Sequence, residues 1–390
     1  MADKVTTSWR NLSSQAAARW DSIANEVELH LSAHWLRSVE GNLEMSPLYL
    51  VRTGAGGEIH GAAVGYLMDD TPQSRADSLI KLSRVDFLLG GLLAGELGRS
   101  AGTAAVLRRL LPSLSCGGWT HANSDIVLSA GLCRRDRRAV AAQVVGGLVE
   151  AAADVGARSV CFPYVEERNQ DLQELLIANE FVQFPAASHY AIDVTWRSFD
   201  DYLLHFPGPR RVKIRREYRR LKEAGVTFRT QRLDEPLARG LLPLAMGTVR
   251  KHQGAISEKS LYDRLRLLVE VGSEVVLLEH DETVKGFGVV IEWRDQLYAR
   301  MCGFDYASQG RLPLYFGLMY EQVRHAIERG LRRIEYGVAI EEAKMSRGAR
   351  RFPQYSYVKA LARADHALVA DAIRRVTEQS SAEYPATNAS

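Results

Sequence analysis

Residues 314–328 carry apolar side chains at spacings of two to four, and this pattern predicts a helix with one apolar face. Gly330 follows the last turn, where the left-handed end of a helix favours glycine. Residues 332–336 predict a short strand, which Gly337 ends. A polar cluster follows, comprising Glu341, Glu342, Lys344, Arg347, Arg350 and Arg351. Ligands bind at the carboxyl ends of strands in open α/β sheets, so this cluster is a candidate site; a solvated charged loop is the alternative.

The remainder of the chain also divides into periodic segments. The predicted helices are residues 15–40, 135–156, 171–179, 199–205, 235–249 and 262–271. The predicted strands are residues 47–52, 59–68, 157–165, 190–194, 274–279, 286–293 and 297–304. Residues 70–103 are rich in loop-forming residues and receive no assignment; their glycine-rich stretch at 90–98 does not match the GxGxxG pattern of a dinucleotide site.

One segment of the first half repeats in the second half. EAAADVGARSVCFPYVEER at 150–168 aligns without a gap on RHAIERGLRRIEYGVAIEEA. Gly156 matches Gly330 and Glu167 matches Glu341, and both copies read as helix, glycine, short strand and acidic loop. Because the copies lie near the end of each half, a duplicated domain is the better explanation of this match.

A strongly basic segment joins the two halves. Residues 207–225 begin with two prolines and end at Gly225, which is the expected punctuation of a helix. Only Glu217 and Glu223 oppose its positive charge, and its apolar residues are too few for a full core face. Such a surface attracts phosphates, and a solvated linker helix is the alternative. The candidate phosphate-binding or nucleic-acid-binding residues are Arg210, Arg211, Lys213, Arg215, Arg216, Arg219 and Arg220.

Composition sets the general class of the protein. The chain has 390 residues, of which 46% are apolar and 25% charged, as expected for a globular protein of two domains. The N-terminus lacks the apolar core of a signal peptide and no apolar run is long enough to span a membrane, so we expect a cytoplasmic protein. Its four cysteines are widely spaced, and no histidine pair has metal-ligand spacing. We therefore expect neither a metal nor another cofactor.

The order of predicted elements in the second half is similar to the acetyltransferase fold called GNAT. LYFGLMYEQVRHAIERGLRRIEYGVAIEEAKMSRGARRFP further resembles the last third of the Fem-like branch of that superfamily, and RRVKIRREYRRLKEAGVTF resembles the helix before its second domain. The resemblance covers about residues 200–360 and implies an α/β (α+β) fold with two tandem GNAT-like domains, each a mixed, largely antiparallel sheet flanked by helices. The expected division is an N-terminal domain at 1–196, a basic linking helix at 197–225, a C-terminal domain at 226–365 and a partly disordered tail at 366–390.

The resemblance also implies a set of activities. The branch contains aminoacyl-tRNA-dependent transferases that build peptidoglycan cross-bridges and relatives in antibiotic pathways, including one that moves serine from seryl-tRNA to isobutylhydroxylamine in valanimycin assembly. It also contains acyl-CoA N-acyltransferases. We expect an aminoacyl-tRNA donor and a small-molecule amine or hydroxylamine acceptor in natural-product biosynthesis. An acyl-CoA-dependent N-acyltransferase and a non-catalytic binding module are the alternatives, because fold alone does not choose among them.

The loop that would hold the pyrophosphate of coenzyme A is poor in this chain. In CoA-using members a glycine-rich loop follows the long central strand and its N–H groups cradle the pyrophosphate. Here that loop reads GFDYASQGRLPLYFG, in which Gly310 has no second glycine near it and Pro313 lacks an N–H donor. This sequence disfavours an acyl-CoA donor without excluding it.

Acyl transfer from an ester to an amine needs a neutral nucleophile, a donor for the oxyanion and a proton for the leaving oxygen. Lys344 matches the recurring lysine of the family segment and is the first candidate for stabilising the acyl oxygen. Glu341 or Glu342 is expected to accept a proton or to hold the donor's ammonium group. The candidate substrate-binding residues are Asp305, Tyr306, Tyr315, Tyr320 and Arg347.

Overall fold

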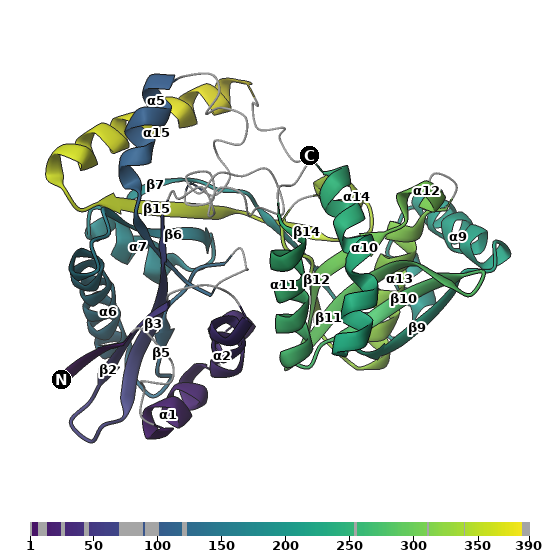
Figure 1. Ribbon diagram of the computed structural model, residues 1–390, viewed down its shortest axis with the longest axis horizontal. Helices are drawn as coiled ribbons and strands as arrows, with labels where there is room; N and C mark the ends of the chain where they lie inside the picture. Colours follow the sequence, from purple (N-terminus) through teal and green to yellow (C-terminus); the bar gives the residue numbers. More distant parts are fainter. Residues whose placement is uncertain are drawn as a thin grey trace. The chain divides into compact units, whose positions relative to one another are not determined.

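The computed structural model of the chain forms two compact units, Met1–Ser188 with Pro353–Ser390, and His189–Phe352 (Figure 1). The structure describes residues 2–6, 14–24, 28–42, 47–69, 89, 101–118, 123–252, 256–309, 312–338 and 340–383. The glycine-rich stretch at 90–98, most of 70–103, and Gly310 therefore lie outside the described residues. Within the described part, no helix is both long enough and apolar enough to cross a membrane.

The first unit is built on one mixed sheet. Its strand order is β1 (Ala2–Thr6), β2 (Pro47–Thr53), β3 (Ile59–Met68), β4 (Ser113–Cys116), β6 (Ser159–Glu166), β15 (Gln354–Ala360) and β7 (Val182–Pro185), with β5 (Val127–Leu128) paired to β3. Only β4 and β6 run parallel among these neighbours. The helices are α1 (Ser14–Ala24), α2 (Ala33–Asn42), α5 (Ala101–Leu107), α6 (Arg134–Asp154), α7 (Gln170–Ala178) and α15 (Arg363–Glu383). The α6 helix packs on the sheet through a buried apolar face that includes Val144 and Leu148.

The second unit repeats this plan. Its strand order is β9 (Thr227–Arg232), β10 (Glu274–His280), β11 (Thr283–Trp293), β12 (Gln296–Phe304), β13 (Arg333–Glu335), β8 (His189–Asp193) and β14 (Arg350–Phe352). Here only β12 and β13 run parallel. The helices are α8 (Phe199–Leu204), α9 (Gly208–Glu223), α10 (Glu235–Lys251), α11 (Glu258–Glu270), α12 (Tyr306–Gln309), α13 (Leu314–Glu328) and α14 (Glu341–Met345).

Two glycines show how helices cover both faces of the second sheet. A Cβ on Gly288 would lie 2.6 Å from Leu318 of α13, so that helix lies directly on the sheet at this point. A Cβ on Gly303 would lie 2.7 Å from the backbone of Leu244 in α10. Gly288 pairs with Cys302, whereas Gly303 pairs with Phe287, so these two glycines point to opposite faces. The α13 helix covers one face and α10 covers the other.

The two sheets exchange one strand each. The positions of β15 in the first sheet and β8 in the second are equivalent, since each lies between a strand of the parallel pair and the last strand. Yet β8 follows β7 along the chain and β15 follows β14. The repeat expected from the sequence agrees with this arrangement: Gly156 ends α6 with a φ of 74°, and Gly330 ends α13 with a φ of 67°.

Strand exchange accounts for the differences from the expected domain limits. The division expected at residue 196 falls at Ser188, because β8 belongs to the second sheet. The basic helix α9 lies within the second unit and does not stand between the units. The second unit ends at Phe352, because β15 and α15 belong to the first unit. The expected tail is therefore helical as far as Glu383, and residues 384–390 lie outside the described residues.

A buried ion pair fixes α9 on α13. Arg347 is fully buried, and its Nη2 donates to Glu217 Oε2 of α9 at 2.6 Å. Its Nε donates to the hydroxyl of Tyr320 at 2.8 Å, and that hydroxyl donates to Glu217. The guanidinium also stacks 3.7 Å from the ring centroid of Phe316. Since Ile214 and Leu221 are also buried, the carboxylate of Glu217 and a narrow apolar stripe together orient the helix.

We predict that Glu217→Ala destabilises the second unit by about 3–5 kcal/mol, because it leaves the Arg347 guanidinium buried without its counter-ion. Glu223→Ala is the matched control, since Glu223 is an exposed glutamate on the same helix. Its removal should change stability by less than about 0.5 kcal/mol. Urea unfolding of both variants measures the difference, and equal midpoints would contradict this role of Glu217.

Candidate functional site

A pocket opens in the second unit where its two parallel strands separate. β12 and β13 pair only over Gln296–Tyr298 and Arg333–Glu335, after which β12 continues beside β11. The pocket between the separating strands has a volume of about 160 Å³. We call it the β12–β13 pocket; it is lined by Ala299, Arg300, Met301, Cys302, Tyr315, Leu318, Met319, Gln322, Tyr336, Val338, Ile340 and Lys344.

A β-bulge shapes the strand that forms one wall. The register of β12 on β11 shifts so that Val289 faces Met301 and Val290 faces Ala299, which leaves Arg300 as the extra residue. Bulges bend a strand and re-aim a side chain, and they are frequent beside active sites. Arg300 lines the pocket, and its burial lowers the pKa of its guanidinium to about 10.

Lys344 lines the pocket and is 4% exposed. Its Nζ donates to the carbonyls of Tyr336 at 2.9 Å, Gly337 at 3.1 Å and Val338 at 2.8 Å. Burial lowers the pKa of Lys344 to about 7. The three carbonyls oppose that shift, because an ammonium offers three N–H donors and a neutral amine only two. We therefore treat Lys344 as a cation that holds the loop after β13 in place.

The loop after β13 carries backbone strain. Ile340 has a φ of 56°, although a β-branched residue rarely adopts the left-handed region. Ile340 is the N-cap residue of α14, and the Lys344 amide donates to its carbonyl at 3.2 Å. Such strain persists only where surrounding contacts enforce it, and it is concentrated at functional sites. The three hydrogen bonds from Lys344 are contacts of that kind.

Two tyrosines line the same pocket. The Tyr336 hydroxyl is buried and has no hydrogen-bond partner among the described residues. Burial raises the pKa values of Tyr336 and Tyr315, so both hydroxyls are protonated donors at neutral pH. Tyr315 was among the residues expected from the sequence, whereas Tyr336 was missed because it was treated only as part of a strand. The sequence feature that could have identified Tyr336 is its position at the carboxyl end of the repeated strand, where ligands bind in α/β sheets.

The structure brings only two of the predicted catalytic and substrate residues, Lys344 and Tyr315, to the lining of this pocket. Tyr320 and Arg347, which were expected to bind substrate, are instead buried in the ion-pair network with Glu217. Their polar groups already have partners there, so they position α9 and α13. This changes the role expected for both residues.

The other predicted residues lie around the pocket but do not line it. Glu341 and Glu342 are exposed on α14, and Glu341 lies beside the Tyr190 hydroxyl. Asp305 pairs with Lys285 at 3.3 Å at the far end of β12, and the Tyr306 hydroxyl donates to Thr248. Their roles in acid–base chemistry or acceptor binding remain predictions.

The basic helix α9 presents its cations to solvent, as its sequence predicts. Arg210 and Arg211 are half-buried, and the other basic residues are exposed, namely Lys213, Arg215, Arg216, Arg219, Arg220 and Lys222. Within the described ranges, no carboxylate forms an ion pair with any of them. The α9 helix packs on α13, and residues of α13 also line the β12–β13 pocket. The α13 helix therefore contacts both the basic helix and the pocket.

Only one group of described side chains has the composition of a metal site. Glu274, Glu292 and His325 have ligand atoms within 4.8 Å of one another. Arg329 donates to both oxygens of Glu292, at 2.9 and 3.2 Å, and His325 Nε2 lies 2.7 Å from Oε1. The Arg329 guanidinium therefore already compensates this carboxylate.

Comparisons with known proteins agree with this architecture. The family model described as FemAB-like, peptidoglycan biosynthesis/recognition, matches residues 128–390. No curated protein sequence matches the chain.

Solved structures of similar fold include FemX, at a TM-score of 0.60 and 12% identity over 95% of this chain and 100% of that one. L-PGS from Bacillus licheniformis has a TM-score of 0.55 and 11% identity, over 94% and 97% of the two chains. A tandem GNAT protein from the clavulanic acid biosynthesis pathway has a TM-score of 0.53 and 12% identity, over 93% and 99%. These likenesses confirm the predicted fold of two tandem GNAT-like domains.

We predict that Tyr336→Phe does not destabilise the protein, because it removes a buried hydroxyl that makes no hydrogen bond within the described residues. Tyr202→Phe is the matched control, since the buried Tyr202 hydroxyl donates to the Arg347 carbonyl at 2.9 Å. That control should cost about 1 kcal/mol. Thermal unfolding compares the two, and a larger loss for Tyr336→Phe would show that its hydroxyl has a structural partner.

Proposed function

The chain belongs to the FemAB-like family and is an acyl- or aminoacyltransferase, and on that premise we propose that its donor is an aminoacyl-tRNA. The acceptor in this proposal is an amine or hydroxylamine of a small molecule. Serine is the first amino acid to test, and antibiotic biosynthesis is the first setting. A panel of charged tRNAs identifies the aminoacyl group.

The observation that supports a tRNA donor is the orientation of α9. The Glu217–Arg347 ion pair fixes the inner side of this helix, so its free cations point away from the fold. An array of exposed arginines without local counter-ions binds a polyphosphate backbone mainly by charge and counterion release. The same helix packs on α13, whose residues line the β12–β13 pocket. This arrangement suits a donor whose phosphates are separate from its reacting ester.

The β12–β13 pocket offers donors for the reacting ester. In aminoacyl transfer the acceptor nitrogen attacks the ester carbonyl carbon, the bond to the ribose oxygen breaks, and the nitrogen's proton ends on that oxygen. Negative charge develops on the carbonyl oxygen, where preorganised donors have their largest effect. In the proposed mechanism the free Tyr336 hydroxyl donates to that oxygen, and Tyr315 donates to the leaving oxygen. Lys344 adds positive potential while it holds the backbone of Tyr336.

Direct transfer is favoured over a covalent enzyme intermediate. Cys302 is the one cysteine that lines the pocket, and its burial raises the pKa of its thiol to about 11. The thiolate is the nucleophilic form of cysteine, so this thiol is a poor nucleophile at neutral pH.

An acyl-CoA donor is the second candidate, because one solved structure of similar fold is a tandem GNAT protein. Two assays separate the donors. Pretreatment of charged tRNA with ribonuclease should abolish product formation, and undiminished product would exclude the tRNA donor. Release of free CoA thiol during turnover would establish the alternative.

We predict that Tyr336→Phe lowers kcat by about 10²-fold with little change in donor KM, because its hydroxyl bonds only in the transition state. Lys344→Met should lower kcat and also reduce stability by about 1–3 kcal/mol, since it leaves the carbonyls of Tyr336 and Val338 without a donor, whereas that of Gly337 keeps the Tyr190 amide. Steady-state kinetics with thermal unfolding distinguish the two variants. A normal kcat in folded Tyr336→Phe would rule out its proposed role.

We predict that replacing Arg215, Arg216, Arg219 and Arg220 with alanine raises the KM for the tRNA donor and leaves the acceptor KM nearly unchanged. The slope of log KM against log salt should fall by roughly 0.7–0.9 for each phosphate that the variant no longer binds. Stability should be unaffected, because exposed charges contribute little. Alanine at Arg374 and Arg375 of α15 is the control for general loss of positive charge. An unchanged donor KM would contradict phosphate binding by α9.

A further inference from the structure

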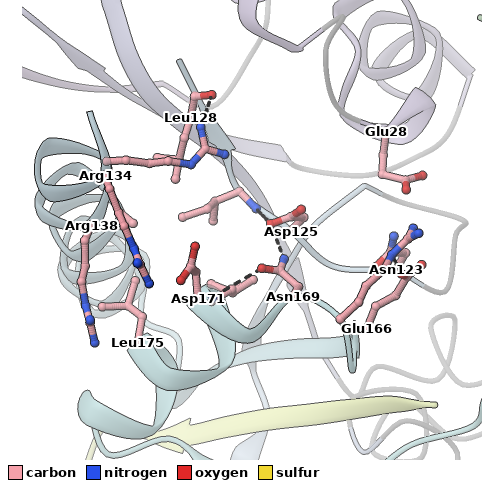
Figure 2. A pocket seen from close by; sticks show the side chains of 15 residues that line it. Glu28, Asn123, Asp125, Leu128, Arg134, Arg138, Glu166, Asn169, Asp171 and Leu175 are labelled. Carbon is pink, nitrogen blue, oxygen red and sulfur yellow. Dashed lines mark hydrogen bonds and ion pairs between the residues drawn. The ribbon is translucent and has the colours of Figure 1, made fainter. Parts of the chain in front are cut away.

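A second pocket lies in the first unit, with a volume of about 340 Å³, within the usual range of small-molecule sites. It is bounded by the first turns of α6, the segment before and within β5, and the loop from β6 into α7 (Figure 2). We call it the α6 pocket; it is lined by Glu28, Asn123, Asp125, Ile126, Leu128, Arg134, Arg137, Arg138, Ala141, Glu166, Arg168, Asn169, Asp171, Leu172 and Leu175.

The α6 pocket occupies the place in the first repeat that the β12–β13 pocket occupies in the second. In the register that sets Gly156 on Gly330, Ala141 corresponds to Tyr315 and Glu166 to Ile340. Each pair has one member in each pocket. The chemistry differs, because Arg134 and Arg138 of α6 align with Ser308 and Leu312, which precede α13. The first unit therefore offers charged groups at the position where the second offers hydroxyls and a lysine.

The arginines of α6 lie on one side of the α6 pocket, whereas Arg168, which also lines it, pairs with Glu166. In Figure 2, Arg134 and Arg138 project from α6, whereas Glu166 and Glu28 lie on the opposite side. Arg138 pairs with Glu174 at 3.3 Å. Among the described residues no side chain pairs with Arg134, so its guanidinium is available to an anion. A carboxylate suits the planar, forked donors of arginine.

Asp125 supplies an acceptor between these two sides. Its Oδ1 accepts from the amide of Ile126 at 2.8 Å and from Asn169 Nδ2 at 2.9 Å. Its Oδ2 accepts no hydrogen bond from the described residues, although Asp125 lines the pocket. Burial raises the pKa of Asp125 to about 6; the charge of Arg137 opposes this shift, but no described cation forms an ion pair with the carboxylate. An ammonium group beside Oδ2 would supply that cation.

Apolar side chains form the remaining wall. Leu128 of β5 and Leu172 and Leu175 of α7 line the pocket, and the two α7 leucines are buried among the core residues of this unit. An aliphatic side chain would bury its surface against them. The lining thus combines an anion-binding group, a cation-binding group and an apolar wall.

We propose that the α6 pocket binds a free aliphatic α-amino acid, with its carboxylate on Arg134, its ammonium on Asp125 Oδ2 and its side chain against the leucines. This site does not rest on the proposed transfer reaction, because the groups that carry it belong to the other unit. A neutral ligand would leave both charged groups unpaired, and a simple anion would use only one of them.

Isothermal titration of the full chain with L-leucine tests the site. Saturable binding at one site is expected. 4-Methylpentanoate lacks the amino group of leucine and isopentylamine lacks its carboxylate, so each should bind at least about tenfold more weakly. Absence of saturable leucine binding, or equally tight binding of 4-methylpentanoate, would overturn the proposal.

Matched variants assign each charge to its partner. Arg134→Ala should weaken binding of L-leucine and 4-methylpentanoate by about tenfold and leave binding of isopentylamine unchanged. Asp125→Asn should weaken binding of isopentylamine by about tenfold and leave binding of 4-methylpentanoate unchanged. Arg135→Ala is the control, since Arg135 is an exposed neighbour on α6 that does not line the pocket. An equal loss in Arg135→Ala would reduce the effect to general charge and refute the site. If Asp125→Asn fails to fold, Arg134→Ala and the two analogues still decide the question.

Discussion

The buried contact between Glu217 and Arg347 is the interaction on which the second unit depends. Removing a guanidinium from water is costly, and here a carboxylate, a tyrosine hydroxyl and an aromatic face compensate that cost. The contact joins α9, α13 and the segment just after α14, where Arg347 lies. A helix as basic as α9 has too few apolar residues to define its own orientation. One carboxylate on its inner side settles that orientation and leaves the cations facing outward.

The geometry of the β12–β13 pocket follows from the sheet. The parallel pair separates after three residues, and in the loop that follows β13 the Gly337 carbonyl accepts from the Tyr190 amide of β8. Lys344 donates to this carbonyl and to those of Tyr336 and Val338, and this contact supports the left-handed Ile340 and keeps Tyr336 at the pocket. The lysine of the family-like segment is thus a positioning residue as much as a charge. The tyrosine hydroxyls are the groups free to contact a substrate.

The sequence predicts the elements around the β12–β13 pocket well and their partners poorly, whereas the segment expected as one helix at 15–40 forms α1 and α2. Apolar periodicity and Gly330 predict α13 and β13. The limits of α9 differ by only one or two residues from Pro207 and Gly225, which mark its ends in the sequence. The exchange of β8 and β15 has no local signal, because an alternating strand pattern does not specify the sheet it joins. Arg347 was expected from the sequence to bind substrate, yet it is fully buried, and its partner Glu217 lies far away in sequence. Tyr336 shows its importance only once its hydroxyl is seen to lack a partner.

The most direct test of this account is the dependence of transfer on donor phosphates. Wild type and the variant with alanine at Arg215, Arg216, Arg219 and Arg220 should be compared with aminoacyl-tRNA and with the matching aminoacyl ester of adenosine, which has no phosphate. If α9 binds phosphates and the β12–β13 pocket performs the chemistry, kcat/KM falls in the variant for tRNA and is equal in both proteins for the adenosine ester. An equal loss with both donors, or a loss with neither, would contradict this division of roles.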